Sequence, residues 1–441
     1  MLVKHIFFSL TILVALSCLL VNGCQPPPMT NTPTTTNTNV LNGNSNTNSS
    51  NSGASTTTRR GNALPITMPV IDAMFSDESF PEAARAAANL TDEELTKVKN
   101  AARDSVLQLN GDPAEDERRS TKNTTESTSR ELESLIGKQK AADLIAFVQT
   151  RWGGDVKTQL IAEPNAVPTD TRIVVNAAAY RMDIFRDGKL IKTYKIGIGY
   201  PEFPLPTGLR EAKEIVFNPT WTPPDEPWVK GKFAPGRKVE AGSKLNPLGP
   251  IKIPIGGPSL IHGGKDPSRL GNFASHGCVG LTNTMVQDFA LEIAAMGGSQ
   301  LTASDVKDHA KKKDETKSVK LSTPVTVELR YETIVVEDGK VHVYRDVYEL
   351  GTNTEENLRK VLSTFGVSFD SLSDTEKSQL KDALVRMAVD AKGNMVNDTP
   401  ENTNNKSGRV TKNIKGAKEV LVDIAALKGK GYPLPVALVQ K

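Results

Sequence analysis

Residues 261–283, IHGGKDPSRLGNFASHGCVGLTN, concentrate the reactive side chains of this chain. They include two of the five histidines, His262 and His276, and the cysteine Cys278. Glycines are interleaved with these groups, which is typical of a loop whose backbone approaches another molecule closely. A thiol and two imidazoles in so short a run predict nucleophilic chemistry. The other segments are interpreted by how they could support this one.

Length and composition narrow the possibilities. The 441 residues predict two or three domains with a sizeable core. The formal net charge of +3 is too small to indicate nucleic-acid binding, and basic and aromatic residues do not alternate in clusters. We therefore expect no nucleic-acid partner.

The N-terminus has the pattern of an export signal. Lys4 precedes an apolar run over residues 6–21 that closes on Cys24. This ending resembles the lipobox of bacterial lipoproteins, so residues 1–24 are predicted to be a lipoprotein-type signal peptide with a membrane-anchoring lipid on Cys24. An ordinary secretory signal or a retained anchor is the alternative. We expect an exported, periplasmic or cell-envelope protein, and Gln25 in place of aspartate favours the outer membrane.

The remaining segments divide by composition and periodicity. Residues 25–62 are rich in Pro, Thr, Asn and Ser, and too poor in apolar side chains to fold, so they predict a disordered linker. Residues 65–160 predict a helical domain, with a capping box at Thr91 and a helix over residues 130–149. No chemistry is evident there, and a packing or spacer role is the simplest interpretation.

From residue 168 the apolar period changes to two. The pairs Asp187-Gly188 and Asp338-Gly339 each predict a hairpin turn. A helix with an apolar stripe is expected after Asn283. We predict a mostly β catalytic domain over residues 168–350, followed by a helical accessory region over residues 351–441. The overall class is α+β.

The central motif is interpreted as a cysteine nucleophile with histidine assistance. His262 comes from a separate segment and can approach freely, so it is the predicted general base, while His276 is expected to orient the loop or bind substrate. The backbone N–H groups of Gly277 and Cys278 are predicted to face an oxyanion. A following helix N-terminus would favour the Cys278 thiolate.

Two alternatives compete with this interpretation. His262, His276 and Cys278 could bind zinc, but no fourth ligand is evident, so neither metal nor cofactor is expected. The histidines could also be purely structural, which is improbable beside the sole thiol that would remain after export. The flanking His276 and Gly277 likewise make a buried, inert role for Cys278 improbable.

Here the sequence resembles a known family. Ser275-His276-Gly277-Cys278, with His262 upstream and Asn283 beyond, is similar to the signature of the L,D-transpeptidase (YkuD-like) catalytic domain. Pro204-Leu205-Pro206-Thr207-Gly208 is similar to a stretch that precedes the site in that family. The likeness covers roughly residues 168–329. One position departs: many members have arginine where this chain has Gly280, and Arg269 or Lys265 could substitute.

The resemblance implies a β-sandwich type of catalytic domain and a peptidoglycan substrate. Cys278 would attack the third residue of a stem peptide and release the terminal D-alanine. The thioester would then pass to an amine, which cross-links the cell wall and so contributes to wall organisation and cell shape. The expected oxyanion- and substrate-binding residues are Gly263, Ser275, Gly277 and Asn283. An L,D-carboxypeptidase or thiol amidase acting on wall peptides, and a non-catalytic wall-binding module, remain the alternatives.

Overall fold

The computed structural model describes residues 64–107, 109, 120–153, 163–221, 238–395 and 413–438. The chain divides into two compact units, Met1–Thr58 and Arg59–Lys441, and every described residue belongs to the second. The predicted signal peptide, the lipid site at Cys24 and the whole predicted linker lie outside the described residues. Within the described ranges, no helix combines the length and the apolar composition that crossing a bilayer requires.

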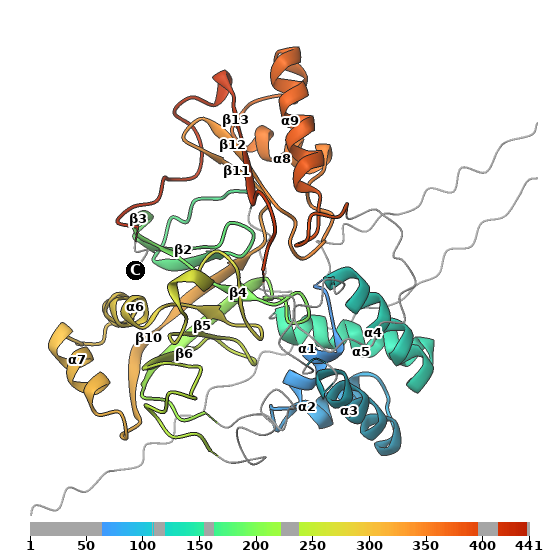
Figure 1. Cartoon of the computed structure of the whole chain (residues 1–441), viewed down its shortest axis with the longest axis vertical. Helices are drawn as coiled ribbons and strands as arrows, with labels where there is room; N and C mark the ends of the chain where they lie inside the picture. The colour runs from blue at the N-terminus through green and yellow to red at the C-terminus, as the bar shows by residue number, and fades with distance from the viewer. Residues whose placement is uncertain are drawn as a thin grey trace, which may run out of the picture. The chain divides into compact units, whose positions relative to one another are not determined.

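The first part of the second unit is helical, as predicted (Figure 1). Its helices share a hydrophobic core that includes Phe80, Leu132 and Trp152. The helices are α1 (Met68–Met74), α2 (Phe80–Ala87), α3 (Asp92–Leu107), α4 (Thr121–Ile136) and α5 (Lys138–Gly153).

Local signals explain where two of these helices begin and end. The predicted capping box is confirmed, because the Thr91 N–H donates to Glu94 Oε2 over 2.8 Å and the Glu94 N–H donates to Thr91 Oγ1 over 3.2 Å. The single helix predicted over residues 130–149 is wrong. Gly137 adopts a φ of 81°, a left-handed conformation that ends α4 and lets α5 start a new direction.

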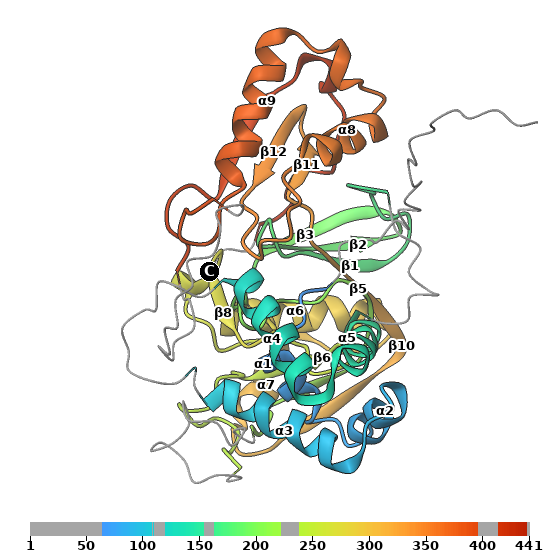
Figure 2. The same ribbon diagram turned by 90° about the vertical axis from the view of Figure 1, so that its right-hand side faces the viewer.

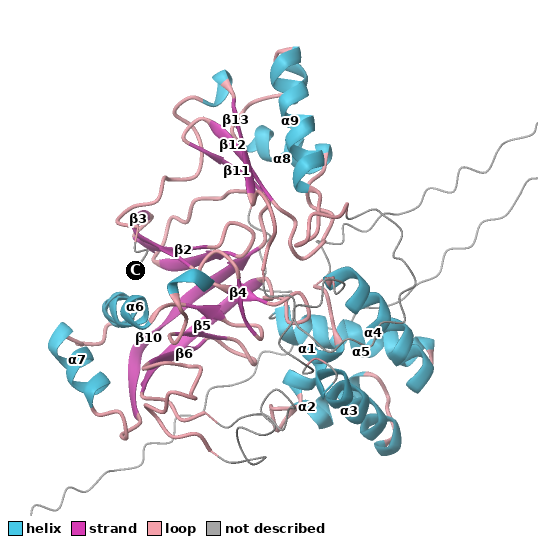
Figure 3. Ribbon diagram, viewed as in Figure 1, coloured by secondary structure: helices cyan, strands magenta, loops and turns pink. Residues whose placement is uncertain are grey.

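Residues 172–330 contribute an eight-stranded mixed sheet in the order β3-β2-β1-β10-β5-β6-β7-β9. Figure 3 shows the long strand β10 running beside β5 and β6 in this region. A separate two-stranded sheet pairs β4 with β8. The strands are β1 (Arg172–Asn176), β2 (Arg181–Arg186), β3 (Lys189–Lys195), β4 (Ile198–Gly199), β5 (Gly208–Phe217), β6 (Ile251–Pro254), β7 (Leu260–His262), β8 (Phe273–Ser275), β9 (Val279–Gly280) and β10 (Lys317–Arg330).

Both predicted hairpin turns are confirmed. Asp187 and Gly188 have φ values of 48° and 76°, and Asp338 and Gly339 have 49° and 75°. Two successive positive φ values match the twist of the flanking strands, which is why Asp-Gly is favoured there. The first turn joins β2 to β3, and the second joins β11 (Ile334–Glu337) to β12 (Lys340–Tyr344).

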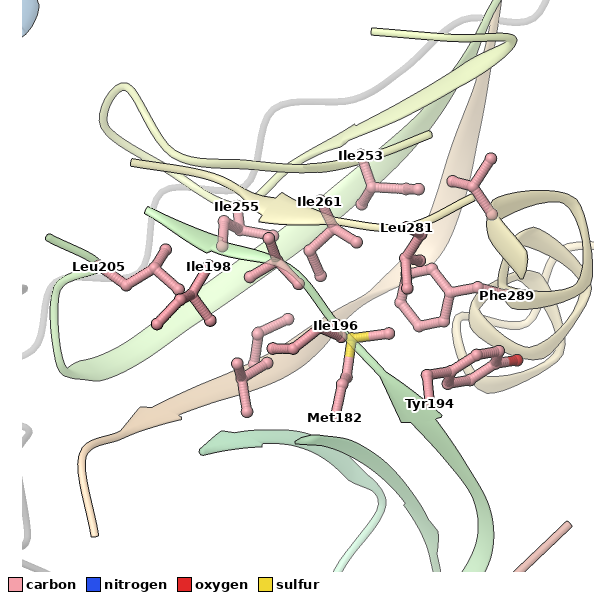
Figure 4. Close-up of a cluster of buried hydrophobic side chains, with 14 of the residues drawn as sticks. Met182, Tyr194, Ile196, Ile198, Leu205, Ile253, Ile255, Ile261, Leu281 and Phe289 are labelled. Atoms are coloured by element: carbon pink, nitrogen blue, oxygen red, sulfur yellow. The ribbon is translucent and has the colours of Figure 1, made fainter. Parts of the chain in front are cut away.

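The core of this region lies between the sheet and the predicted helix α6 (Asn283–Met296). Thr282 caps α6 by accepting the N–H of Met285 over 3.2 Å, and the predicted apolar stripe of the helix is buried. Figure 4 shows Phe289 of α6 beside Tyr194 and Leu281 within this core. The short helix α7 (Ala303–Lys311) then leads into β10.

The C-terminal region differs from the prediction of a helical accessory segment. The β11–β12 hairpin pairs with β13 (Glu419–Asp423) in a three-stranded sheet, rather than with the catalytic sheet. Helices α8 (Glu355–Thr364) and α9 (Asp374–Met387) flank this sheet and share its separate core (Figure 2). The predicted boundary at residue 350 therefore falls between β12 and β13, two strands that pair in one sheet.

Candidate active site

Two short parallel strands bring the histidine and cysteine segments together. Ile261 of β7 lies opposite Val279 of β9, and His262 lies opposite Gly280. Ile261 and Val279 are fully buried in the core. Because side chains alternate along a strand, His262 and Gly280 lie on the other face. Cys278 lies in the bend that leads directly into β9, so the pairing of β7 with β9 brings the segment of the predicted nucleophile alongside the predicted base.

The ring of His262 is fixed in orientation and tautomer. Its Nδ1 lies 2.7 Å from the carbonyl oxygen of Gly263. A carbonyl only accepts, so Nδ1 carries the proton and Nε2 keeps a lone pair in the neutral ring. Burial, together with the charge of Lys265, lowers the pKa of His262 to about 3. The imidazole is therefore neutral near pH 7 and can accept a proton at Nε2.

Cys278 is a free thiol that is partly exposed to solvent. Burial raises its pKa above the ordinary value, while a hydrogen bond from the Leu260 backbone and the charge of Lys265 oppose that shift. The prediction that a helix N-terminus favours the thiolate is wrong. Strand β9 and two further residues separate Cys278 from Asn283, the first residue of α6, and a helix dipole acts mainly within its first turn.

Ser275 braces the nucleophile loop from within. Its Oγ accepts the Cys278 N–H over 3.0 Å and donates to the Cys278 carbonyl over 2.5 Å. The Cys278 amide is thus engaged, contrary to the prediction that it faces an oxyanion. Gly277 has a φ of 90°, and its N–H makes no hydrogen bond within the described residues. The predicted oxyanion role therefore remains open for the Gly277 amide.

The other two predicted binding residues hold the loop that follows His262. The Gly263 N–H donates to the Ile251 carbonyl over 3.1 Å, and Asn283 Oδ1 accepts the Gly264 N–H over 2.8 Å. These bonds give both residues a positioning function. Contact with substrate stays a prediction for them.

His276 lies between two aromatic rings. Its ring centroid is 5.1 Å from that of Tyr200 and 4.7 Å from that of Phe203, both in edge-on geometry. The side chain remains exposed to solvent. Desolvation of the ring, together with the charge of Lys265, lowers the pKa of His276, so this imidazole is neutral as well. Packing of this kind fits the predicted role of orienting the loop.

Residues of the helical region lie beside the site, although no sequence motif associates them with it. Thr67 Oγ1 of the α1 cap donates to the Glu202 carbonyl over 2.7 Å, and Thr121 Oγ1 donates to the Pro201 carbonyl over 2.9 Å. A hollow of about 240 Å³, part of it open to solvent, adjoins the nucleophile loop. Its lining includes Val70, Ala73, Trp152, Phe203, Ser259 and Gly277. No sequence motif marks Val70, Ala73 and Trp152, because their contribution depends on packing between distant segments.

Across the described ranges, no group of three or more His, Cys, Asp or Glu side chains is arranged to hold a metal ion. His262, His276 and Cys278 instead share the positive charge of Lys265, which acts on all three.

Comparison with known proteins assigns the sheet region to a family. Residues 170–327 match the YkuD family, the L,D-transpeptidase catalytic domain, which confirms the resemblance read from the motif and the α+β class. The match covers well under half of the chain. No curated protein matches the chain.

Several solved L,D-transpeptidase structures resemble the chain distantly. A mutant of the Enterococcus faecium enzyme has 17% identity and a TM-score of 0.21, covering 36% of this chain and 50% of that one. The isolated E. faecium catalytic domain has 19% identity and a TM-score of 0.23, covering 37% of this chain and 100% of that domain. An enzyme from Mycobacterium tuberculosis has 14% identity and a TM-score of 0.21, covering 36% of this chain and 57% of that one. The chain thus spans about half the length of the longer enzymes, and the assignment rests on the family model.

Proposed function

We propose that this chain, which carries an L,D-transpeptidase catalytic domain at residues 170–327, is a cysteine-dependent acyltransferase acting on peptidoglycan stem peptides. The observation that supports the proposal is the pairing of β7 with β9, which sets His262 opposite Gly280, two residues after Cys278. The contact of His262 Nδ1 with the Gly263 carbonyl supports the role of a base, because it favours the tautomer in which Nε2 is the proton acceptor.

The proposed reaction begins from a neutral thiol and a neutral imidazole. As Cys278 Sγ attacks the carbonyl carbon of the third stem residue, His262 Nε2 removes the thiol proton. The carbonyl oxygen gains negative charge, which the Gly277 N–H is suited to stabilise. The C–N bond then breaks, His262 returns the proton to the departing amine of D-alanine, and a thioester remains on Cys278.

The second half of the reaction transfers the acyl group. An amine of another stem peptide attacks the thioester carbonyl, and His262 accepts the proton that this amine loses. The C–S bond then breaks, and His262 returns the proton to the sulfur of Cys278. The product is a direct cross-link between two stems. If water replaces the amine, the result is carboxypeptidase activity.

We further propose that the protein works in the cell envelope. The support is the predicted signal at residues 1–24 and the predicted lipid on Cys24. Release of the protein from membranes by the Cys24→Ala change would agree with a lipid anchor, whereas unchanged membrane association would contradict it.

Mass spectrometry of muropeptides tests the reaction directly. The purified chain and its Cys278→Ala variant are incubated with tetrapeptide stems. Loss of D-alanine together with a new dimer, absent in the variant, supports the transpeptidase. Loss of D-alanine without a dimer indicates a carboxypeptidase. No reaction from either protein would favour the wall-binding module.

A further inference from the structure

The side chain of Lys265 occupies the space above Gly280. A Cβ added to Gly280 would stand 2.8 Å from Lys265 Cγ, 3.1 Å from Cε and 3.3 Å from Cδ, and these are its three nearest atoms. The backbone of Lys265 is fixed by an N–H donated to the Leu281 carbonyl over 3.1 Å. The lysine stem therefore crosses the strand face that also carries Cys278.

The positive charge of the Lys265 ammonium acts on all three candidate catalytic residues. Its charge lowers the pKa values of Cys278, His262 and His276. Burial in turn lowers the pKa of Lys265 to about 8. Among the described residues, Lys265 forms no ion pair with Asp or Glu, and the charges acting on it are those of Cys278 and Arg269. The Lys265 side chain lies over Gly280, two residues after Cys278. A lysine in this place that pairs with no described carboxylate can bind an anionic group of the substrate.

Arg269, the other cation of this loop, is committed elsewhere. Its guanidinium donates to the Phe273 carbonyl and, over 3.3 Å, to Asn413 Oδ1. It also acts on the hydroxyl of Tyr200. These contacts hold the loop together, which leaves Lys265 as the cation that can meet a ligand.

We propose that Lys265 binds the C-terminal carboxylate of the donor peptide and makes the site selective for peptides that end one residue beyond the scissile bond. The inference rests on the proposed function, because the scissile carbonyl is taken to lie at Cys278. One residue of extended chain spans at most about 3.6 Å, so a carboxylate one residue further on falls beside a cation that already interacts with the thiol. An amidated or extended peptide lacks the charge at this point.

Kinetics with matched peptides test the assignment in the full chain. The substrates are a stem tetrapeptide with a free terminal carboxylate and the same peptide ending in an amide. We expect the unaltered protein to prefer the acid at least about tenfold in kcat/KM, from one charge-assisted contact. Lys265→Met keeps the stem but removes the charge, and should raise KM for the acid about tenfold and so remove the preference for the acid. Any change in Cys278 reactivity affects both peptides alike and leaves the acid-to-amide ratio as the readout. Lys265→Arg should retain the preference.

Control variants separate charge from folding. Lys213→Met removes an exposed lysine on β5 that pairs with Glu211, and it should change neither substrate's kinetics. Lys265→Met should also shift the pH profile of Cys278 alkylation upward, because a positive neighbour of the thiolate is lost. An unchanged acid-to-amide ratio in folded Lys265→Met would overturn the proposal.

A positional swap provides a second, independent test. Gly280→Arg alone places a side chain against the lysine stem and should impair the protein. Combining it with Lys265→Ala clears that space and delivers a cation from position 280 instead. Recovery of the acid preference in the double variant supports the placement, whereas a folded double variant without that preference contradicts it.

Binding measurements distinguish this inference from the reaction itself. In the Cys278→Ala background, calorimetry compares the acid and amide peptides with and without Lys265→Met. If the unaltered chain releases no D-alanine but the acid still binds more tightly through Lys265, the transpeptidase proposal fails and the carboxylate site stands. Equal affinity for both peptides would refute the carboxylate site whatever the catalytic result.

Discussion

At the residue scale, the resting site holds neutral reactants rather than a preformed ion pair. Burial raises the pKa of Cys278 and lowers that of His262, so both shifts oppose transfer of the thiol proton before substrate arrives. In the proposed mechanism, His262 therefore accepts the proton during the attack itself. The carbonyl of Gly263 prepares it by fixing the proton on Nδ1.

Removing the imidazole tests this role. His262→Ala should lower kcat by about 10² to 10⁴, the usual contribution of a positioned general base, with a smaller change in KM. Steady-state release of D-alanine measures it. The matched control is His342→Ala, whose ring pairs with Glu419 in the C-terminal sheet. A His262→Ala variant within about threefold of the unaltered kcat would exclude His262 as the base.

The pH dependence of the thiol follows from its surroundings. Because the pKa of Cys278 is raised, its thiolate fraction should keep increasing above pH 9, and the rate of alkylation by iodoacetamide should rise in parallel. Stopped-time mass spectrometry between pH 6 and about pH 10 gives the profile, corrected for the pH dependence of a free cysteine. A plateau below pH 8 would mean that the thiolate is stabilised instead.

At the scale of elements, short strands and one hydroxyl give the site its geometry. β7 and β9 are only a few residues long, and the turn between β8 and β9 is held by Ser275. This turn contains Gly277 in a left-handed conformation. The loop is therefore rigid through local bonds rather than through burial of large side chains.

Deleting that hydroxyl should loosen the nucleophile. Ser275→Ala removes two hydrogen bonds, each contributing on the order of 1 kcal/mol, so the thermal midpoint should fall by a few degrees. We expect kcat to fall at least about tenfold because Cys278 loses its fixed orientation. Ser275→Thr keeps the hydroxyl and should recover most of the activity. Full activity in Ser275→Ala would show that the brace is dispensable.

Prediction from sequence succeeded where the determining signal is local. The Asp-Gly turns, the Thr91 capping box and the stripe of α6 each depend on residues within a few positions of one another. The break at Gly137 was local too, but an isolated glycine does not by itself distinguish a tolerated helix residue from a helix end. Strand β13 was missed because its partner β12 lies far away in the sequence.

The candidate site shows the same limit. Cys278, His262 and His276 stand out by residue type, and the strand register sets His262 beside the segment that follows Cys278. The choice between Lys265 and Arg269 could not be made from sequence, since it depends on which guanidinium or ammonium already has partners. The raised pKa of Cys278 likewise reflects burial that spacing alone does not encode.

At the scale of the whole molecule, a buried carboxyl links the helical region to the end of the catalytic region. Glu349 Oε1 accepts the N–H of Thr121, the first residue of α4, over 3.0 Å. Burial raises the pKa of Glu349 from 4.5 to about 7. The folded state thus binds this proton more tightly than the unfolded state does.

Stability should therefore depend on pH through this group. Between about pH 4.5 and pH 7 the folded chain holds more protons, so the contribution of Glu349 to the free energy of unfolding decreases as pH rises and is lowest above pH 7. The change is at most about 3 kcal/mol, at about 1.4 kcal/mol per pKa unit. Glu349→Gln should flatten this dependence in urea unfolding followed at pH 5, 6 and about 8. An identical dependence in the variant would assign it to other groups.

The order of strands in the eight-stranded sheet also constrains when the sheet can form during synthesis. β10, the last of its strands to be synthesised, is inserted between β1 and β5, and without it the sheet consists of two unconnected halves. Pairing strands so distant in sequence is slow, because a long loop must close before any contact offsets the entropy cost of closing it. A ribosome that has not yet reached residue 330 therefore carries a chain without a catalytic domain. The sheet therefore forms only after β10 has been made, close to three quarters of the way along the chain.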